Sequence, residues 1–298
     1  MLNFEKNYPK KAVISNRIGM FYQKENKLDS AHYFHFKALM LSKKSENDNQ
    51  EIGISLNKIG VVYYYKGNLD SAIVFFEKSI PYYTDQNLKA NSINNLATML
   101  KHQSKPDKAI KNYILALNIY EAQKDTSKQV FVLNNIGGLY NDLSDYTKAN
   151  EYLNKGVLLA KKSFNKEGEY LCKNNLVNTL IAEKNYDDAI YNLQESIEYF
   201  EKTEQYNFLI VCKNNLANCF DGKGEKERAL SIYLDIIKII DKTGIENSKE
   251  AFLINISSSY TDLEDYDKAL SYGYKALSFS KKNNLVLRYE PIYENLSL

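Results

Sequence analysis

A motif recurs about every 40 residues along this 298-residue chain, and this period constrains the fold more than any other feature. Each copy contains an alanine, and successive alanines are 41, 37, 40, 40, 40 and 40 residues apart. They are Ala31, Ala72, Ala109, Ala149, Ala189, Ala229 and Ala269. Twelve residues before each alanine lies a mostly small position, which follows Ile or Leu and precedes a large residue by three. Four positions in register over seven copies predict a repeat protein.

The spacing within one copy is helical. Apolar, small and large positions at i, i+1 and i+4 lie on one face of a helix. The alanine begins a second helical stripe, in which another small residue follows after seven positions in every copy except at Ile236. Turn-forming segments, such as residues 66–68 and 221–224, separate the two stripes. Each copy is therefore expected to be a helix–turn–helix hairpin that buries its second face by stacking on its neighbours.

The pattern Ile-Gly-x-x-Tyr, followed by an alanine, an aromatic residue and another small residue, resembles the tetratricopeptide repeat. The resemblance extends over roughly residues 12–298. Because the common period of that family is about 34 residues, the longer period here suggests longer helices. Asn-Asn segments, such as 94–97 and 134–137, look most like the long repeats of kinesin light chains. They are also similar to those of bacterial Rap-type peptide receptors and repeat-bearing sensor regulators.

The predicted fold is all-α, a right-handed α-solenoid superhelix of seven such hairpins plus the start of an eighth. We expect one solenoid over residues 1–298, with repeats at approximately 12–52, 53–89, 90–129, 130–169, 170–209, 210–249 and 250–289 and a partial eighth at 290–298. Pro81 is expected to kink or end the second helix of the second repeat. The partial eighth repeat suggests a piece of a longer protein, and a natural end with one extra capping helix is the alternative.

A row of asparagines is the main candidate site. The second residue of each Asn-Asn pair recurs with the full period, as Asn95, Asn135, Asn175, Asn215, Asn255 and Asn295. It is expected to face away from the hairpin core, where folding does not require an amide. An amide both donates and accepts hydrogen bonds, so this ladder is predicted to pair with the backbone of an extended peptide. Alternatively, these side chains bond between adjacent repeats or to water, the role favoured for the first Asn of each pair.

Positions one helical turn away from the ladder are expected to supply sequence preference. They are Phe131, Leu171 and Val211 with Asn91 and Ala251 on one side, and Asn178 and Asn218 with Thr98, Gly138 and Ser258 on the other. The first two repeats carry Arg17 and Lys58 in the ladder register. These cations could hold an acidic residue or a carboxylate end of the ligand, or they could form a solvated basic end.

Other chemistry finds little support in the sequence. We see no phosphate loop, nucleophile elbow or zinc-protease motif, so we predict no enzyme and no cofactor. His32 and His35 share a helical face without a third ligand, which argues against a metal site. The three cysteines suggest packing residues rather than a disulfide framework. A net charge of +2 with interspersed signs argues against nucleic-acid binding by this segment.

No apolar run is long enough to span a membrane, and the N-terminus lacks a signal-peptide core. A soluble protein is expected; a cytoplasmic location is favoured and the periplasm is left open. The leading hypothesis is a protein- or peptide-binding scaffold. The alternative is a regulatory domain of a larger bacterial signalling protein, such as a peptide-responsive regulator, a repeat-bearing histidine kinase or a transcription regulator. A third possibility is self-association through uncapped ends.

Overall fold

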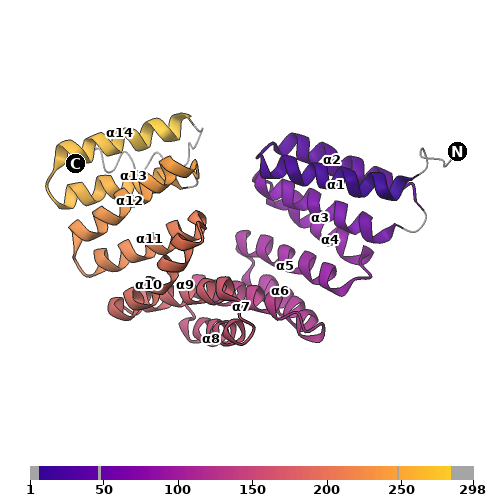
Figure 1. The fold of residues 1–298 in the computed structure, drawn as a ribbon, viewed down its shortest axis with the longest axis horizontal. Helices are drawn as coiled ribbons and strands as arrows, with labels where there is room; N and C mark the ends of the chain where they lie inside the picture. The colour runs from indigo at the N-terminus through magenta and orange to yellow at the C-terminus, as the bar shows by residue number, and fades with distance from the viewer. Residues whose placement is uncertain (1–6, 46–47, 247, 283–298) are drawn as a thin grey trace. The chain divides into compact units, whose positions relative to one another are not determined.

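The computed structural model describes residues 7–45, 48–246 and 248–282. Within these ranges the chain forms fourteen α-helices and no strand, arranged as seven hairpins (Figure 1). The first helices of the hairpins are α1 (Tyr8–Lys24), α3 (Asn49–Tyr65), α5 (Gln86–His102), α7 (Thr126–Asp142), α9 (Lys166–Ala182), α11 (Tyr206–Gly222) and α13 (Lys249–Asp262). The second helices are α2 (Leu28–Ser42), α4 (Leu69–Ser79), α6 (Pro106–Ala122), α8 (Tyr146–Lys162), α10 (Tyr186–Lys202), α12 (Lys226–Thr243) and α14 (Tyr266–Lys282).

The chain divides into two compact units, one of residues 1–169 and one of residues 170–298. In unit 1, each helix from α1 to α7 packs on the next helix in the sequence, and α1, α3, α5 and α7 also contact one another in succession. In unit 2, the same sequential packing runs from α10 to α14. The all-α stack of helical hairpins predicted from the sequence is therefore confirmed. The superhelical hand of the whole chain and the limits of the individual repeats stay predictions.

The recurring small positions are explained by close helix–helix approach. All seven recurring alanines are buried. A Cβ atom built on Gly137 would lie 2.3 Å from Cγ of Leu153, and one on Gly60 would lie 2.9 Å from the ring of Phe76. The small residue of the first helix thus receives the large side chain that lies four residues after the alanine in the second helix. This fit brings the two helices of a hairpin into close packing.

The recurring large residue closes the turn of its hairpin. Its carbonyl oxygen accepts a hydrogen bond from an amide five residues later, as from Lys105 to Leu100 at 2.9 Å and from Asn185 to Leu180 at 2.8 Å. The residue before each donor takes a left-handed conformation, as at Ser104 with φ 55°. This bond pattern satisfies carbonyl groups that the helix end leaves without partners.

The second repeat departs from the others as expected. Helix α4 ends at Ser79, and Pro81 lies in a short 3-10 helix, η2 (Ile80–Tyr82). The early stop confirms the prediction made for Pro81. It also places Tyr83 in a buried position against Gly53 of α3. The expected eighth repeat at 290–298, including Asn295, lies outside the described residues.

Candidate functional site

The asparagine pairs lie on the first helices of the hairpins and link neighbouring repeats. In unit 1, Nδ2 of Asn57 donates to Oγ of Ser92 at 2.6 Å, and Nδ2 of Asn135 donates to Oδ1 of Asn94 at 3.1 Å. Thus α3 is tied to α5, and α5 to α7, by hydrogen bonds from asparagine side chains of the first helices. The structural role favoured for the first Asn of each pair agrees with these bonds.

In unit 2 the same link involves Asn215 of α11. Its Nδ2 donates to Oδ1 of Asn174 at 3.2 Å and to Oδ1 of Asn178 at 3.0 Å. Asn215 is only 7% exposed, so the expectation that this ladder position faces solvent is wrong there. The physical reason is that both amide hydrogens find acceptors on α9, which draws the side chain into the joint between the two helices. Only the amide oxygen of Asn215 can still accept a hydrogen bond from a ligand.

The joint between the first two repeats has different chemistry. Nδ2 of Asn16 donates to Oε1 of Glu51 at 2.6 Å and to Oγ of Ser55 at 2.8 Å. The amide oxygen of Asn16 lies 2.8 Å from Nδ1 of His35. Burial, with a smaller contribution from the Lys58 charge, lowers the pKa of His35 to about 4. Burial also raises the pKa of the Glu51 carboxyl. The imidazole is therefore neutral at physiological pH in the folded protein.

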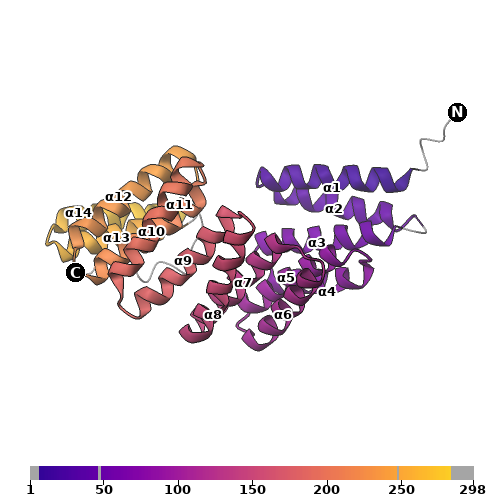
Figure 2. The same ribbon diagram turned by 60° about the horizontal axis from the view of Figure 1, so that its bottom comes forward.

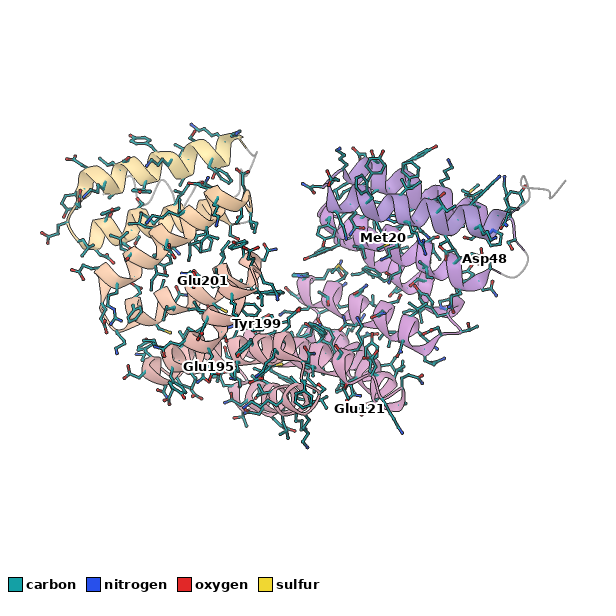
Figure 3. All side chains as sticks on the ribbon, viewed as in Figure 1. Met20, Asp48, Glu121, Glu195, Tyr199 and Glu201 are labelled. Carbon is teal, nitrogen blue, oxygen red and sulfur yellow. The ribbon has the colours of Figure 1, made fainter. Side chains whose placement is uncertain are left out.

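The remaining predicted site residues differ in exposure. Asn95, Asn135, Asn175, Asn255, Asn218, Phe131, Leu171 and Lys58 are partly exposed, whereas Asn178, Val211 and Arg17 are exposed. Nδ2 of Asn178 lies 3.4 Å from Oδ1 of Asn175, and the hydroxyl of Tyr233 donates to Oδ1 of Asn218 at 2.9 Å. Most of the predicted positions are thus accessible on their own unit. Figure 3 draws the described side chains as sticks on the ribbon.

A pocket of about 220 Å³ in unit 1 brings two predicted residues together. Its lining includes Lys58 and Asn95, with Asn91, Tyr83 and Ile54 beside them. Burial lowers the pKa of Lys58, and no carboxylate in the described part of the chain forms an ion pair with its ammonium group. A partly desolvated cation without a counterion favours an incoming anion. This pocket is therefore suited to a carboxylate.

A larger pocket of about 520 Å³ lies in unit 2 and has no charged lining residue. Its apolar surface comes from Ile210, Val211, Ile245 and Phe252, and Asn255 is among its polar groups. It lies between the ladder face of α11, the first turns of α13 and the segment that joins α12 to α13. An apolar pocket with several amide groups at its rim is suited to an uncharged side chain flanked by peptide backbone.

Sequence reasoning missed several of the lining residues. Tyr83 lies after the break at Pro81, yet it is eleven residues after Ala72, as the buried Tyr120 is eleven residues after Ala109. Ile245 belongs to the connection that follows α12 and has no position in the repeat register. Tyr120 was missed as well, although its hydroxyl donates to Oδ1 of Asn91 at 2.6 Å. The common distance from the recurring alanine could have found Tyr83 and Tyr120, whereas no sequence signal marks Ile245.

The described residues contain no group of three His, Cys, Asp or Glu side chains arranged to hold a metal ion. Nε2 of His32 lies 3.3 Å from the hydroxyl of Tyr63. All three cysteines are buried free thiols, and burial raises the pKa of Cys172 and Cys212 to about 12 and that of Cys219 to about 11. They are therefore packing residues with little thiolate character. No described helix is both long and apolar enough to cross a membrane.

Family models for the tetratricopeptide repeat match residues 55–81, 88–162 and 250–283. These segments of the chain are tetratricopeptide repeats. A comparison with curated proteins gives no match. Among solved structures, a Rap protein complexed with competence and sporulation factor is 17% identical, with a TM-score of 0.68 over 96% of this chain and 76% of that one.

Two other structures add to the fold assignment. A tetratricopeptide repeat protein from Parabacteroides merdae is 14% identical, with a TM-score of 0.65 over 96% of this chain and 99% of that one. Repeats of a kinesin light chain from Podosopora anserina, also 14% identical, give a TM-score of 0.53 over 67% of this chain and 99% of that one. At these identities the likeness establishes the fold alone.

Proposed function

We propose that the chain binds an extended peptide along the ladder face of its first helices, without catalysing a reaction. The observation that carries this proposal is Lys58, whose partly buried ammonium group lines a pocket beside Asn95 and has no anionic partner there. In unit 1, the peptide presents a carboxylate to Lys58, from an acidic side chain or from its C-terminus.

The hydrogen bonds between asparagines of neighbouring repeats orient the ladder side chains for this role. Asn135 uses one amide hydrogen to bond Asn94, which fixes its orientation and leaves the second hydrogen and the oxygen for a peptide. Neighbouring helices lie about 8–10 Å apart, so one ladder position serves roughly three residues of an extended chain. Since an orientation fixed in advance lowers the entropy lost on binding, the joint and the binding function support each other.

Unit 2 is proposed to read a different feature of a peptide. Its pocket accepts an apolar side chain between Val211 and Phe252, while Asn255 bonds the adjacent backbone. Asn215 contributes only as an acceptor, because its two amide hydrogens are engaged within the protein. The two units therefore differ in the residue type that they select.

The experiment is selection from a displayed library of random peptides of roughly ten residues, followed by titration of selected synthetic peptides. Asn95→Ala is expected to weaken peptides that protect α3 and α5 from hydrogen exchange, and Val211→Asp to weaken those that protect α11 and α13. The matched control is Lys111→Ala, on the exposed side of α6. Peptides that are selected but protect only second helices would refute the proposal.

A regulatory role is the second candidate. It is motivated by the similar structure of a Rap protein in complex with competence and sporulation factor. If the chain is a sensor, a selected peptide should change the distance between labels on α4 and α12, measured by double electron–electron resonance. An unchanged distance distribution at saturating peptide would favour the plain scaffold.

A further inference from the structure

We propose that the outer face of α1 is a docking surface for an acidic amphipathic helix of a partner protein. This surface consists of Ile14 and Phe21 with the cations Lys10, Arg17 and Lys24. Arg17 occupies the ladder position of the first repeat, whereas the carboxylate pocket proposed above is lined by residues such as Lys58 of α3 and Asn95 of α5. Helix α1 is the outermost helix of unit 1, with α2 and α3 packed on its other sides (Figure 2).

Comparison with the other repeats identifies this face. The residue three positions before the ladder position is buried in repeats two to seven, as Ser55, Ser92, Val132, Cys172, Cys212 and Phe252. The residue four positions after it is also buried, as Val62, Met99, Leu139, Thr179, Cys219 and Ser259. In the first repeat these positions are Ile14 and Phe21, which are 55% and 60% exposed. In the later repeats of each unit, the residues at these two positions are covered by the preceding hairpin.

The residue types at these two positions indicate a helix as the occupant. Where the preceding hairpin provides cover, the chain often uses small or polar residues such as Ser55 and Ser92, yet the uncovered copy carries a large aliphatic and an aromatic residue. The Phe21 ring is fixed edge-on against Tyr22, with centroids 5.8 Å apart. Ile14 and Phe21 are separated by two helical turns, or roughly 10 Å, which is the spacing of knobs along a helix–helix seam.

The charges around the seam define the partner. Lys10, Arg17 and Lys24 recur every seven residues between and beside the apolar pair, and all three are exposed. No described carboxylate forms an ion pair with any of them. Residues 8–45 contain eight lysines and arginines against two acidic residues, although the whole chain has a net charge of only +2. A helix with Glu or Asp flanking an apolar stripe is complementary to this pattern.

The same charges disfavour a second copy of this chain. A symmetric pairing through α1 places each cation of one copy near those of the other, and like charges across a seam oppose association. The surface is also a stripe on one helix rather than a broad basic patch. Its geometry therefore selects a helix over an extended anionic surface.

The test uses the full chain and a fluorescent synthetic helix of roughly 20 residues, with a leucine stripe flanked by glutamates. Fluorescence polarisation is expected to show saturable binding to the wild type. Binding should fall at least about tenfold with Ile14→Ser/Phe21→Ser, because serine is compatible with both positions elsewhere in the chain. The control variant is Tyr33→Ser/Met40→Ser, which removes two side chains of α2 that are each 60% exposed and should leave binding unchanged.

A charge-reversed variant, Lys10→Glu/Arg17→Glu/Lys24→Glu, should lose the acidic helix and bind a matched helix with lysines instead. Circular dichroism should show unchanged helicity in every variant, since all the altered side chains are exposed. The proposal is overturned by equal binding of a scrambled acidic peptide or by full binding to Ile14→Ser/Phe21→Ser. It is also overturned if light scattering shows a dimer of the wild type that becomes a monomer in Ile14→Ser/Phe21→Ser. Binding of the protein to phosphatidylserine vesicles without binding to the acidic helix would overturn it as well.

Discussion

In unit 1 the joint between the first two repeats is built from ionisable side chains, whereas an equivalent joint in unit 2 is neutral. Asn16 contacts Glu51 and His35, but Asn215 contacts only the amides of Asn174 and Asn178. The ladder faces differ in the same sense, with Lys58 in one pocket and an uncharged lining in the other. The repeat register therefore determines where polar joints form, and the local residue type decides whether a joint responds to charge and pH.

The largest difference between the two units is expected when the small residue in the first helix of a hairpin is enlarged. Gly137→Val should destabilise unit 1 by about 3 kcal/mol, because the added atoms overlap Leu153. Unit 2 carries Val177 in the same register without such a conflict. Urea unfolding followed by hydrogen exchange tests this, with Lys111→Val on the exposed side of α6 as the control. Equal stability of the two variants would show that the close approach in unit 1 is not rigid.

The second largest difference is expected on acidification, which should destabilise unit 1 more than unit 2. The folded pKa of His35 is about 4 and its ordinary value is 6.5, so the unfolded chain takes up a proton first as the pH falls. Unit 1 should therefore lose stability from pH 6.5 down to pH 4, by about 2 kcal/mol between pH 7 and pH 5. Glu51 acts in the opposite sense, because its raised pKa adds stability as the pH falls towards its ordinary value of 4.5.

The pH dependence is measured by hydrogen exchange of segments from each unit. His35→Phe, which copies the pairing of Gly60 with Phe76, should remove the loss and leave the weak opposite trend of Glu51. A similar acid-induced loss in the α11–α12 segments, or its persistence in the variant, would contradict this assignment.

A smaller difference is expected when the hydrogen-bonded asparagines between repeats are removed from each unit. Asn215→Ala leaves the buried amide of Asn174 without its partner and is expected to cost roughly 1.5 kcal/mol. Asn135→Ala removes one partly exposed bond and should cost about half as much. Thermal and urea unfolding of both variants measures the difference. If Asn135→Ala proved the more damaging, the ladder in unit 1 would be primarily structural.

The fold followed from the sequence because close helix packing leaves its mark on residue size. Ala149 and Gly137 are small where helices touch, and Tyr140 recurs where the turn is closed, so helices and hairpins could be located. The consequence of Pro81 was equally local. All of these features depend on contacts within one repeat or between equivalent positions.

The candidate site was less predictable because exposure on one helix face depends on what the next repeat supplies. Asn95 and Asn215 share a register position, yet Asn215 turns inward because Asn174 and Asn178 both offer acceptors. Ile245 enters a pocket from an irregular segment, where periodicity carries no information. Whether Lys58 has a counterion depends on its distances to carboxylates in the folded chain, and a sequence pattern does not contain these distances.

The peptide-binding claim is tested most directly at Lys58, by titrating one selected unit-1 peptide as its free acid and as its C-terminal amide. Wild type should prefer the carboxylate about tenfold, or roughly 1.4 kcal/mol. Lys58→Met should bind both forms equally, whereas Lys108→Met, at an exposed lysine of α6, should keep the preference. A carboxylate preference that survives in Lys58→Met, or none in the wild type with either a terminal or a side-chain carboxylate, would contradict the account.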